Sequence, residues 1–209
     1  MKTATVTCEL TITNQWRHYE LIVIGTSLGG LKALTVVLNY LPKNFSVPVA
    51  VVQHRHKASD RTLVASLQHH TSLAVKEAED KEEILPGWVY LAPADYHLLV
   101  ESSNITASRP YFALSTDPPV TYARPSIDIL FETAAEAYRE KAIGVLLTGA
   151  NQDGVKGLAK IKACGGLTIV EEPTTAFCPI IPAAAIKAKV ADKIFPLEHI
   201  SLFLVKICN

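Results

Sequence analysis

Cysteine is scarce in this 209-residue chain, and its four cysteines never form a C-x-x-C pair. This spacing disfavours a zinc site built on paired thiolates, and it gives no sign of a disulfide framework. It is typical of reduced thiols in a cytoplasmic protein. The residues are Cys8, Cys164, Cys178 and Cys208.

Long apolar runs are also missing. No stretch of 18 or more apolar residues occurs, which disfavours a transmembrane helix. The first 20 residues lack the apolar segment of about 7–15 residues that a secretory signal needs. We therefore expect a cytoplasmic protein without membrane insertion.

Net charge is the third absence. Lys and Arg number 20 and Asp and Glu number 20, so the formal charge is 20 − 20 = 0. A balanced chain offers no large electrostatic footprint for nucleic acid or an anionic membrane. With 49% hydrophobic and 19% charged residues, the composition is that of a globular protein. A chain of this length suits a single domain.

Apolar segments alternate with amphipathic ones along the chain, which predicts βαβ units and a parallel sheet. We expect an α/β fold of one domain, with a doubly wound, mostly parallel sheet. Three short segments, "LAVKEA", "GWVYLAP" and "YHLLVES", predict a small antiparallel β excursion at one sheet edge. The main expected strands are 20–25, 47–54 and 142–149. The expected helices include 29–40, one that begins near Ser59 and Asp60, one that Ser126 caps, "VKGLAKIKA" and a closing helix at "EHISLFLVKI".

Three reactive side chains follow three of these expected strands. They are Ser27, His54 and Asp153. Ligands of doubly wound sheets bind at the carboxyl ends of the strands. A serine, a histidine and a carboxylate are the groups that a Ser-His-Asp hydrolase needs.

Ser27 has competing interpretations. "GTSLG" (25–29) fits G-x-S-x-G, a sharp strand-to-helix turn that exposes a nucleophilic hydroxyl. The N-terminus of the following helix could equally hold a phosphate, or the segment could be a plain turn. A dinucleotide fingerprint would need glycine in place of Ser27, and no Walker lysine follows. The nucleophile is favoured, and nucleotide binding is the weaker alternative.

The histidines divide by context. His54 ends an expected strand and suits a general base, although it could be structural. With His56 it forms an H-x-H pair that could bind metal, but no acidic or thiol companion stands at convincing spacing. Adjacent histidines near the end of the second helix are expected at the surface, and three others lack a motif; these are His69 and His70, then His18, His97 and His199.

Asp153 lies in "ANQDG" before an expected helix, so it could simply cap that helix. Three other aspartates compete for the carboxylate role. The order Ser27, Asp153, His199 would match an α/β-hydrolase, but its elbow normally follows several strands. Too few residues precede Ser27 for that, which favours the order Ser27, His54, Asp153. The competing residues are Asp95, Asp117 and Asp128.

Five ordered blocks carry a resemblance. "VIGTSLGG", "VVQH", "YLAPADYHLLVE", "RPSIDILFETAA" and "GVLLTGANQDGVKGL" resemble the catalytic domain of chemotaxis protein-glutamate methylesterases (CheB type), from about residue 20 to about residue 197. The resemblance implies a doubly wound α/β domain that hydrolyses glutamate methyl esters on cytoplasmic chemoreceptor helices and releases methanol. Some members also deamidate glutamine. It implies Ser27, His54 and Asp153 as the triad, and no metal or organic cofactor.

The resemblance divides the chain into an N-terminal extension (1–19) and a catalytic domain (20–209). Members often carry a receiver domain ahead of the catalytic domain. Because fewer than 20 residues precede the resemblance here, we expect no such domain in cis. The substrate would be a chemoreceptor or another methylated protein.

Four positions depart from the family pattern, and we expect them to form the walls and oxyanion region of the site. Leu28 stands where threonine is frequent, and Arg55 begins "RH" where Met-Pro is usual. Ala150 and Asn151 replace methionine and glycine. Backbone amides near His54 and Ala150, with the N-terminus of the following helix, are the expected oxyanion donors. The alternative is a weakened module that binds methylated or glutamate-rich helices without hydrolysing them.

Overall fold

The computed structural model describes residues 18–55, 62–102 and 109–208. Seven strands form the main sheet of this part of the chain, in the order β3-β4-β2-β1-β7-β8-β9, and every neighbouring pair is parallel. A separate hairpin pairs β5 with β6 in antiparallel orientation. The predicted α/β fold with a mostly parallel sheet is confirmed. The strands are β1 (Leu21–Thr26), β2 (Val49–Gln53), β3 (Ala74–Glu77), β4 (Trp88–Leu91), β5 (His97–Glu101), β6 (Tyr111–Ser115), β7 (Ala142–Leu146), β8 (Leu167–Glu171) and β9 (Lys193–Phe195).

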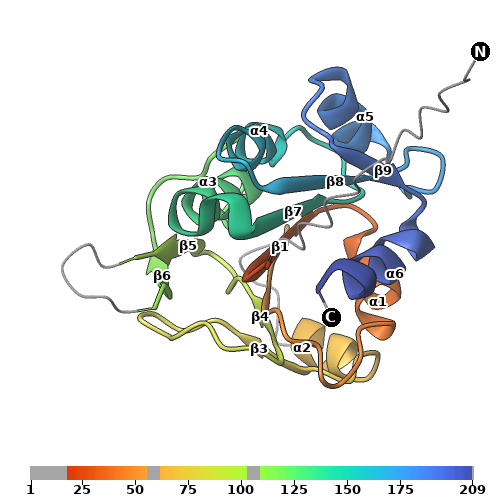
Figure 1. Cartoon of the computed structure of the whole chain (residues 1–209). Coiled ribbons are helices and arrows are strands. Elements are labelled where there is room, and N and C mark those ends of the chain that lie inside the picture. The colour runs from red at the N-terminus through yellow and green to blue at the C-terminus, as the bar shows by residue number, and fades with distance from the viewer. Residues whose placement is uncertain (1–17, 56–61, 103–108, 209) are drawn as a thin grey trace, which may run out of the picture.

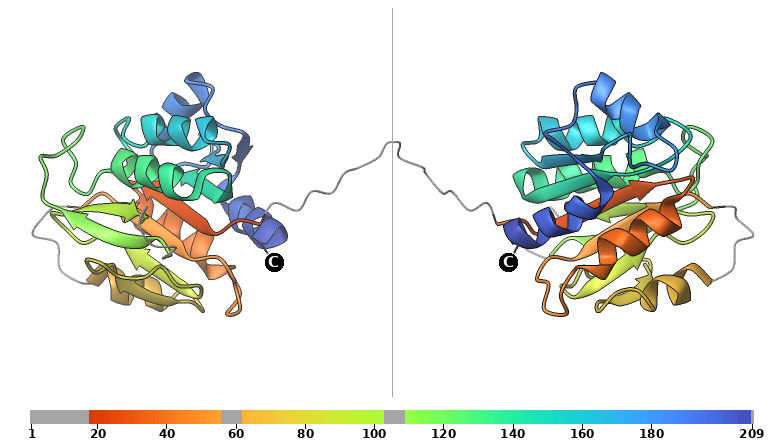
Figure 2. Two further views of the ribbon diagram at one scale, coloured as in Figure 1. Left: turned by 60° about the vertical axis from the view of Figure 1, so that its left-hand side comes forward. Right: turned by 90° about the vertical axis from the view of Figure 1, so that its right-hand side faces the viewer.

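The sheet is the middle of three layers (Figures 1 and 2). One face packs on α1, α2 and α6, and the other packs on α3, α4, α5 and the β5–β6 hairpin. Two apolar cores result, one on each side of the sheet. The helices are α1 (Gly30–Asn39), α2 (Thr62–Gln68), α3 (Ile127–Tyr138), α4 (Val155–Ala163), α5 (Ile180–Lys187) and α6 (Leu197–Cys208), with a 3₁₀ turn at Arg139–Lys141.

β1 is the central strand of the sheet, and only its last residue, Thr26, is polar. All six of its residues are buried, as expected for a parallel strand covered on both faces. It lies between β2 and β7, and Gly25 is opposite Val52 on one side and Leu146 on the other. The carboxyl ends of these three strands therefore meet at one edge, the position at which doubly wound sheets bind ligands.

The antiparallel excursion is smaller than the sequence suggested. β3 and β4 are parallel members of the main sheet, and only β5 pairs in antiparallel fashion, with β6, a strand that the sequence did not indicate. β4 is nearly all buried and pairs with β2, so burial on both faces assigns it to the main sheet. Short strands between turns resemble a meander in sequence, which explains the error.

Helix boundaries follow their local signals. Ser126 caps α3 as predicted, because its hydroxyl accepts the N–H of Ile129. Gly29 precedes α1 with φ of 84°, a left-handed conformation that favours glycine. The candidate caps Ser59 and Asp60 lie outside the described residues, as does the His56 of the H-x-H pair.

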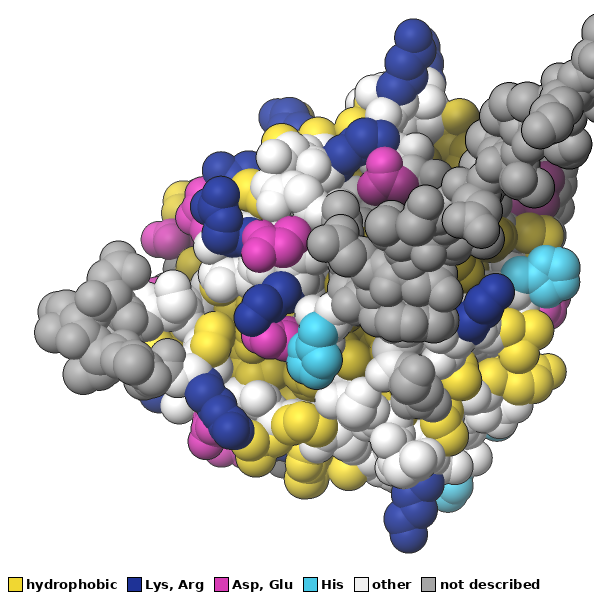
Figure 3. Space-filling model, in the orientation of Figure 1, with side chains coloured by type: hydrophobic (Ala, Val, Ile, Leu, Met, Phe, Trp, Pro, Cys, Tyr) yellow, Lys and Arg dark blue, Asp and Glu magenta, His cyan; other side chains and the backbone are white. Residues whose placement is uncertain are grey.

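No helix in the described ranges is both long and apolar enough to span a membrane. Figure 3 shows acidic and basic side chains interspersed over one face of the molecule, without a large patch of one sign on that face.

Candidate active site

Ser27 is the first residue after β1, and both neighbouring strands fix its backbone. Its N–H donates to the Thr148 carbonyl oxygen (2.9 Å). Its carbonyl oxygen accepts from Gln53 Nε2 (2.8 Å) and from the N–H of Gly30 (3.0 Å). The side chain of Ser27 is partly exposed and lines a cavity of about 700 Å³ together with Leu28 and His54. The turn therefore presents the hydroxyl at the sheet edge.

Glycine at position 149 lets the loop after β7 approach Ser27 closely. A Cβ atom added at Gly149 would stand 2.8 Å from Ser27 Cβ and 2.3 Å from the Ile181 side chain. A larger residue would therefore push the two loops apart. The same loop continues to Ala150, Asn151 and Asp153, so a single segment passes both Ser27 and His54.

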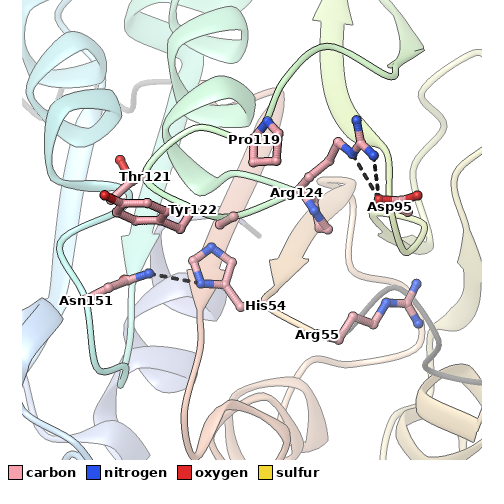
Figure 4. A pocket seen from close by; sticks show the side chains of 10 residues that line it. His54, Arg55, Asp95, Pro119, Thr121, Tyr122, Arg124 and Asn151 are labelled. Atoms are coloured by element: carbon pink, nitrogen blue, oxygen red, sulfur yellow. Dashed lines mark hydrogen bonds and ion pairs between the residues drawn. The ribbon is translucent and has the colours of Figure 1, made fainter.

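His54 is the first residue after β2, and its ring is held from two sides. Nε2 lies 2.8 Å from Asp153 Oδ2, and Nδ1 lies 3.3 Å from Asn151 Nδ2. Because a carboxylate only accepts, Nε2 carries the proton and Nδ1 keeps the lone pair. Asn151 Oδ1 accepts the N–H of Asp153 (3.2 Å), which orients the amide with its nitrogen toward the imidazole (Figure 4).

Asp153 is fully buried, and every hydrogen-bond partner of its carboxylate is a donor. Oδ2 accepts from His54 Nε2 and from the N–H of Ile127 (2.7 Å). Oδ1 accepts from Ser126 Oγ (2.9 Å) and from the N–H of Asp128 (3.1 Å). Burial raises the pKa of Asp153, but these hydrogen bonds outweigh it and leave the pKa below its usual value. The residue stays ionised beside the imidazole.

Asp153 does cap a helix, but not the one that the sequence suggested. Asp153 binds the N-terminus of α3, not that of the helix that follows it in the chain. Asp128, in the first turn of α3, accepts from the N–H groups of Gly154 and Gly157 (2.8 Å each) and so caps α4. The N-terminus of each helix is therefore capped by a carboxylate from the loop or first turn of the other helix. The carboxylate accepts from N–H groups that have no partner within their own helix.

The other candidate carboxylates lie elsewhere. Asp128 accepts from the backbone at the start of α4, and its carboxylate makes no hydrogen bond to His54. Asp95 accepts from Arg124 at 2.6 Å, and Asp117 bonds the same arginine through its carbonyl oxygen. Among the described residues, only Asp153 hydrogen-bonds the imidazole of His54 with a carboxylate.

His97 is a supporting residue that sequence reasoning missed. It is 1% exposed, donates from Nε2 to the Pro118 carbonyl (3.2 Å), and accepts at Nδ1 from the N–H of Ser126 (3.2 Å). It therefore fixes Ser126, whose hydroxyl holds Asp153. Ser126 itself is fully buried, so it is poorly placed to act as a nucleophile. The one sequence signal for His97 is its place in "YLAPADYHLLVE", a segment that resembles the methylesterase family.

Arg55 anchors the loop after β2. Its Nη2 donates to Glu77 and to the Ala92 carbonyl (2.9 Å), and its side chain is 7% exposed. Nε and Nη1 are buried and have no hydrogen-bond partner among the residues that the structure describes. With His54 and Asn151 it lines a second cavity, of about 640 Å³. Arg55 is thus a wall of the site that also ties His54 to β3 and β4.

The expected oxyanion donors are only partly available. The N–H of His54 donates to the Thr26 carbonyl (3.0 Å), which continues the β-ladder and removes this amide from the set. No described residue accepts the N–H groups of Leu28, Gly29 or Ala150. The available donors therefore lie beside Ser27 and in the β7 loop.

The described residues contain no group of three or more His, Cys, Asp or Glu side chains that could hold a metal ion. Cys164, Cys178 and Cys208 are free thiols, and Cys8 lies outside the described ranges. Among the described histidines, His69 and His70 are exposed at the end of α2, as expected.

The proximity of Asp128 to the charged Asp153 leads to a prediction about stability and pH. Burial and the negative charge of Asp153 raise the pKa of Asp128 to about 6, although the N–H groups of Gly157 and Gly154 oppose the shift. Ionising Asp128 thus costs more in the folded protein than in the unfolded chain. Its contribution to the free energy of unfolding is present below pH 3.8 and is lost as pH rises through about 6. The loss amounts to about 3 kcal/mol at most.

Asp128→Asn keeps an acceptor oxygen for α4 and removes this charge. Urea unfolding at pH 4.5 and pH 7.5 should show that the variant's stability, relative to the wild type, improves by about 1–3 kcal/mol at the higher pH. Equal differences at both pH values would contradict the assigned cause.

Comparisons with known proteins show which family the chain resembles. The family model "CheB methylesterase" matches residues 22–204. A Leptospira interrogans protein with the provisional name protein-glutamate methylesterase/protein-glutamine glutaminase is 45% identical over 190 residues, which is 91% of this chain and 95% of that protein. A Thermotoga maritima protein named protein-glutamate methylesterase/protein-glutamine glutaminase is 38% identical over 198 residues, 95% of this chain and 57% of that protein.

The crystal structure of the Thermotoga maritima CheB methylesterase catalytic domain superposes with a TM-score of 0.86 at 38% identity, covering 90% of this chain and 98% of that one. The chain spans nearly all of the Leptospira relative and about half the length of several other curated relatives. With a matching family model over most of its length, the chain belongs to the CheB methylesterase family.

Proposed function

We propose that this protein is a protein-glutamate methylesterase in which Ser27 is the nucleophile, His54 the general base and Asp153 the residue that orients the imidazole. The observation that carries the proposal is the 2.8 Å contact between His54 Nε2 and the buried Asp153. It leaves Nδ1 as the basic nitrogen, and His54 shares a cavity with Ser27.

The reaction proceeds by acyl transfer. Ser27 Oγ attacks the ester carbonyl carbon while its proton passes to His54 Nδ1. The tetrahedral intermediate expels the methoxy group, which takes that proton and leaves as methanol, and a glutamyl ester forms on Ser27. A water molecule then attacks the acyl-enzyme and gives one proton to His54, which passes it to Ser27 Oγ as the ester bond breaks. Glutamate leaves as the carboxylic acid and loses its remaining proton to solvent. Asp153 stabilises the transient imidazolium.

Backbone N–H groups would stabilise the oxyanion. Those of Leu28, Gly29 and Ala150 are the candidates, because none donates to another described residue. The N-terminus of α1 adds a partial positive charge beside Ser27. Deamidation of glutamine would use the same steps with ammonia as the leaving group, and the names of the relatives include that activity.

The proposed substrates are the methylated cytoplasmic helices of chemoreceptors or of another methylated protein, which would place the enzyme in the cytoplasm. Methanol release from a panel of methylated receptor fragments tests the function. Release from at least one fragment supports it. If none yields methanol, and a serine-directed phosphonate leaves the protein unlabelled, the protein is a non-catalytic binding module.

Asn151 supports a prediction of its own. Its amide donates to the nitrogen that must accept the Ser27 proton. Asn151→Asp would place an acceptor there and hold the ring as an imidazolium, which cannot act as a base. We expect kcat to fall by about 100-fold or more, the contribution of a general base.

Asn151→Ala is the matched control, because it removes the donor without adding charge. Its kcat should stay within about tenfold of the wild type, since one neutral hydrogen bond contributes about 1 kcal/mol. Steady-state methanol release measures both variants. Equal kcat values for the two would show that the residue does not act through His54.

A further inference from the structure

The segment between β6 and α3 contains two consecutive residues in the left-handed region, Thr121 (φ 50°) and Tyr122 (φ 64°). Val120 and Ala123 close the turn with two backbone hydrogen bonds, of 3.1 and 2.8 Å. Tight two-residue turns of this kind favour Asn-Gly, because both central residues need positive φ. A β-branched residue and a bulky aromatic residue are outliers there. The turn is therefore strained.

The second central residue of this strained turn, Tyr122, has a side chain that is not packed into the core. Tyr122 is 103% exposed, the value of a side chain that packs on nothing. Its phenol makes no hydrogen bond to another described residue. An exposed aromatic ring at a strained position suggests a role outside folding, since strain of this kind clusters at functional sites.

The base of the turn is firmly held. Arg124 donates to Asp95 Oδ1 from Nε (3.1 Å) and Nη2 (2.6 Å). Its Nη1 donates to the carbonyl oxygens of Thr116 (2.7 Å) and Asp117 (3.1 Å). The ring of Tyr122 is thus presented on a fixed support.

The turn stands beside the catalytic imidazole. Tyr122 lines the 640 Å³ cavity whose wall also includes His54 and Asn151, and Figure 4 shows its ring on the same side of His54 as Asn151. Pro119, Ala123 and Pro125 give this part of the lining an apolar character. His54 belongs both to this cavity and to the one that contains Ser27. A polypeptide whose ester reaches Ser27 can therefore extend past His54 onto Tyr122.

We propose that Tyr122 is a substrate-contact residue that packs on an apolar side chain of the polypeptide, next to the methylated glutamate. The inference rests on the proposed function and adds a determinant of specificity for protein substrates. Tyrosine suits such a contact, because its ring offers a large area and loses little conformational entropy on binding.

The test compares two substrates in two variants. Tyr122→Asn removes the ring and suits a left-handed position, so the melting temperature should not fall. The ratio of kcat/KM for a methylated receptor fragment to kcat/KM for a small glutamate methyl ester should fall about tenfold, mainly through KM. Thr121→Asn relieves strain at the neighbouring residue and keeps the ring, so its ratio should match the wild type.

Binding of the fluorescently labelled, methylated fragment in a Ser27→Ala background measures the same contact without turnover, so failure of the esterase proposal would not obscure the result. The dissociation constant should rise about tenfold when Tyr122→Asn is added. An unchanged dissociation constant and an unchanged substrate ratio would overturn the inference. A lower melting temperature of Tyr122→Asn would instead give the ring a structural role and also overturn it.

Discussion

Ser27→Ala should lower the rate of methanol release from a methylated receptor fragment by a factor on the order of 10⁴–10⁶, the loss seen when a serine hydrolase loses its nucleophile. The fold should be retained. The hydroxyl of Ser27 makes no hydrogen bond to a described residue, and the turn is held through the backbone. The free energy of unfolding should therefore change by no more than about 0.5 kcal/mol.

Ser66→Ala is the control for this variant. Ser66 lines the same cavity as Ser27, but it lies in α2 and follows no strand end. Its removal should leave methanol release within about twofold of the wild type, as expected for a side chain outside the reacting set. If Ser27→Ala keeps more than a tenth of the wild-type rate, Ser27 is not the nucleophile.

Asp153→Asn should lower kcat by a factor on the order of 10⁴, the effect of the equivalent change in a serine protease. Both carboxylate oxygens accept from donors only. In the variant, an amide NH₂ replaces one of the two carboxylate oxygens, and at either oxygen it would face a donor. If the NH₂ faces His54, Nε2 must become the acceptor. The ring proton would then move to Nδ1, the nitrogen that must accept the Ser27 proton.

The same argument predicts a loss of stability, because an amide nitrogen among donors leaves at least one buried group unpaired. That loss is about 1–3 kcal/mol, so activity is measured at a temperature at which both proteins are folded by circular dichroism. Asp128→Asn is the matched control, since Asp128 is buried at the same helix junction without touching His54. A kcat of Asp153→Asn within tenfold of the wild type would reduce Asp153 to its structural role at α3.

The strand ends could be predicted from sequence because local pattern decides them. Continuous apolar runs at β1, β2 and β7 leave no face for water, and a reactive residue follows each run. Parallel pairing then brings the three carboxyl ends together. The fold class and the neighbourhood of Ser27, His54 and Asp153 follow from these features.

The partners of these residues could not be predicted, because they depend on contacts across the chain. Nothing near Asp153 in sequence indicates that it binds the N-terminus of α3, about 26 residues earlier. The support of Ser126 by His97 depends on the β5 strand packing beside α3. Likewise, the amide of Asn151 reaches Nδ1 only because the β7 loop folds over His54.

Mass spectrometry after treatment with a serine-directed phosphonate tests the central claim most directly. The account predicts a single adduct on Ser27 in the wild type, and labelling that is at least about 1,000-fold slower in Asp153→Asn, because the imidazole can no longer activate the hydroxyl. An adduct on Ser126 or on any other serine, or equal labelling rates in the two proteins, would contradict it.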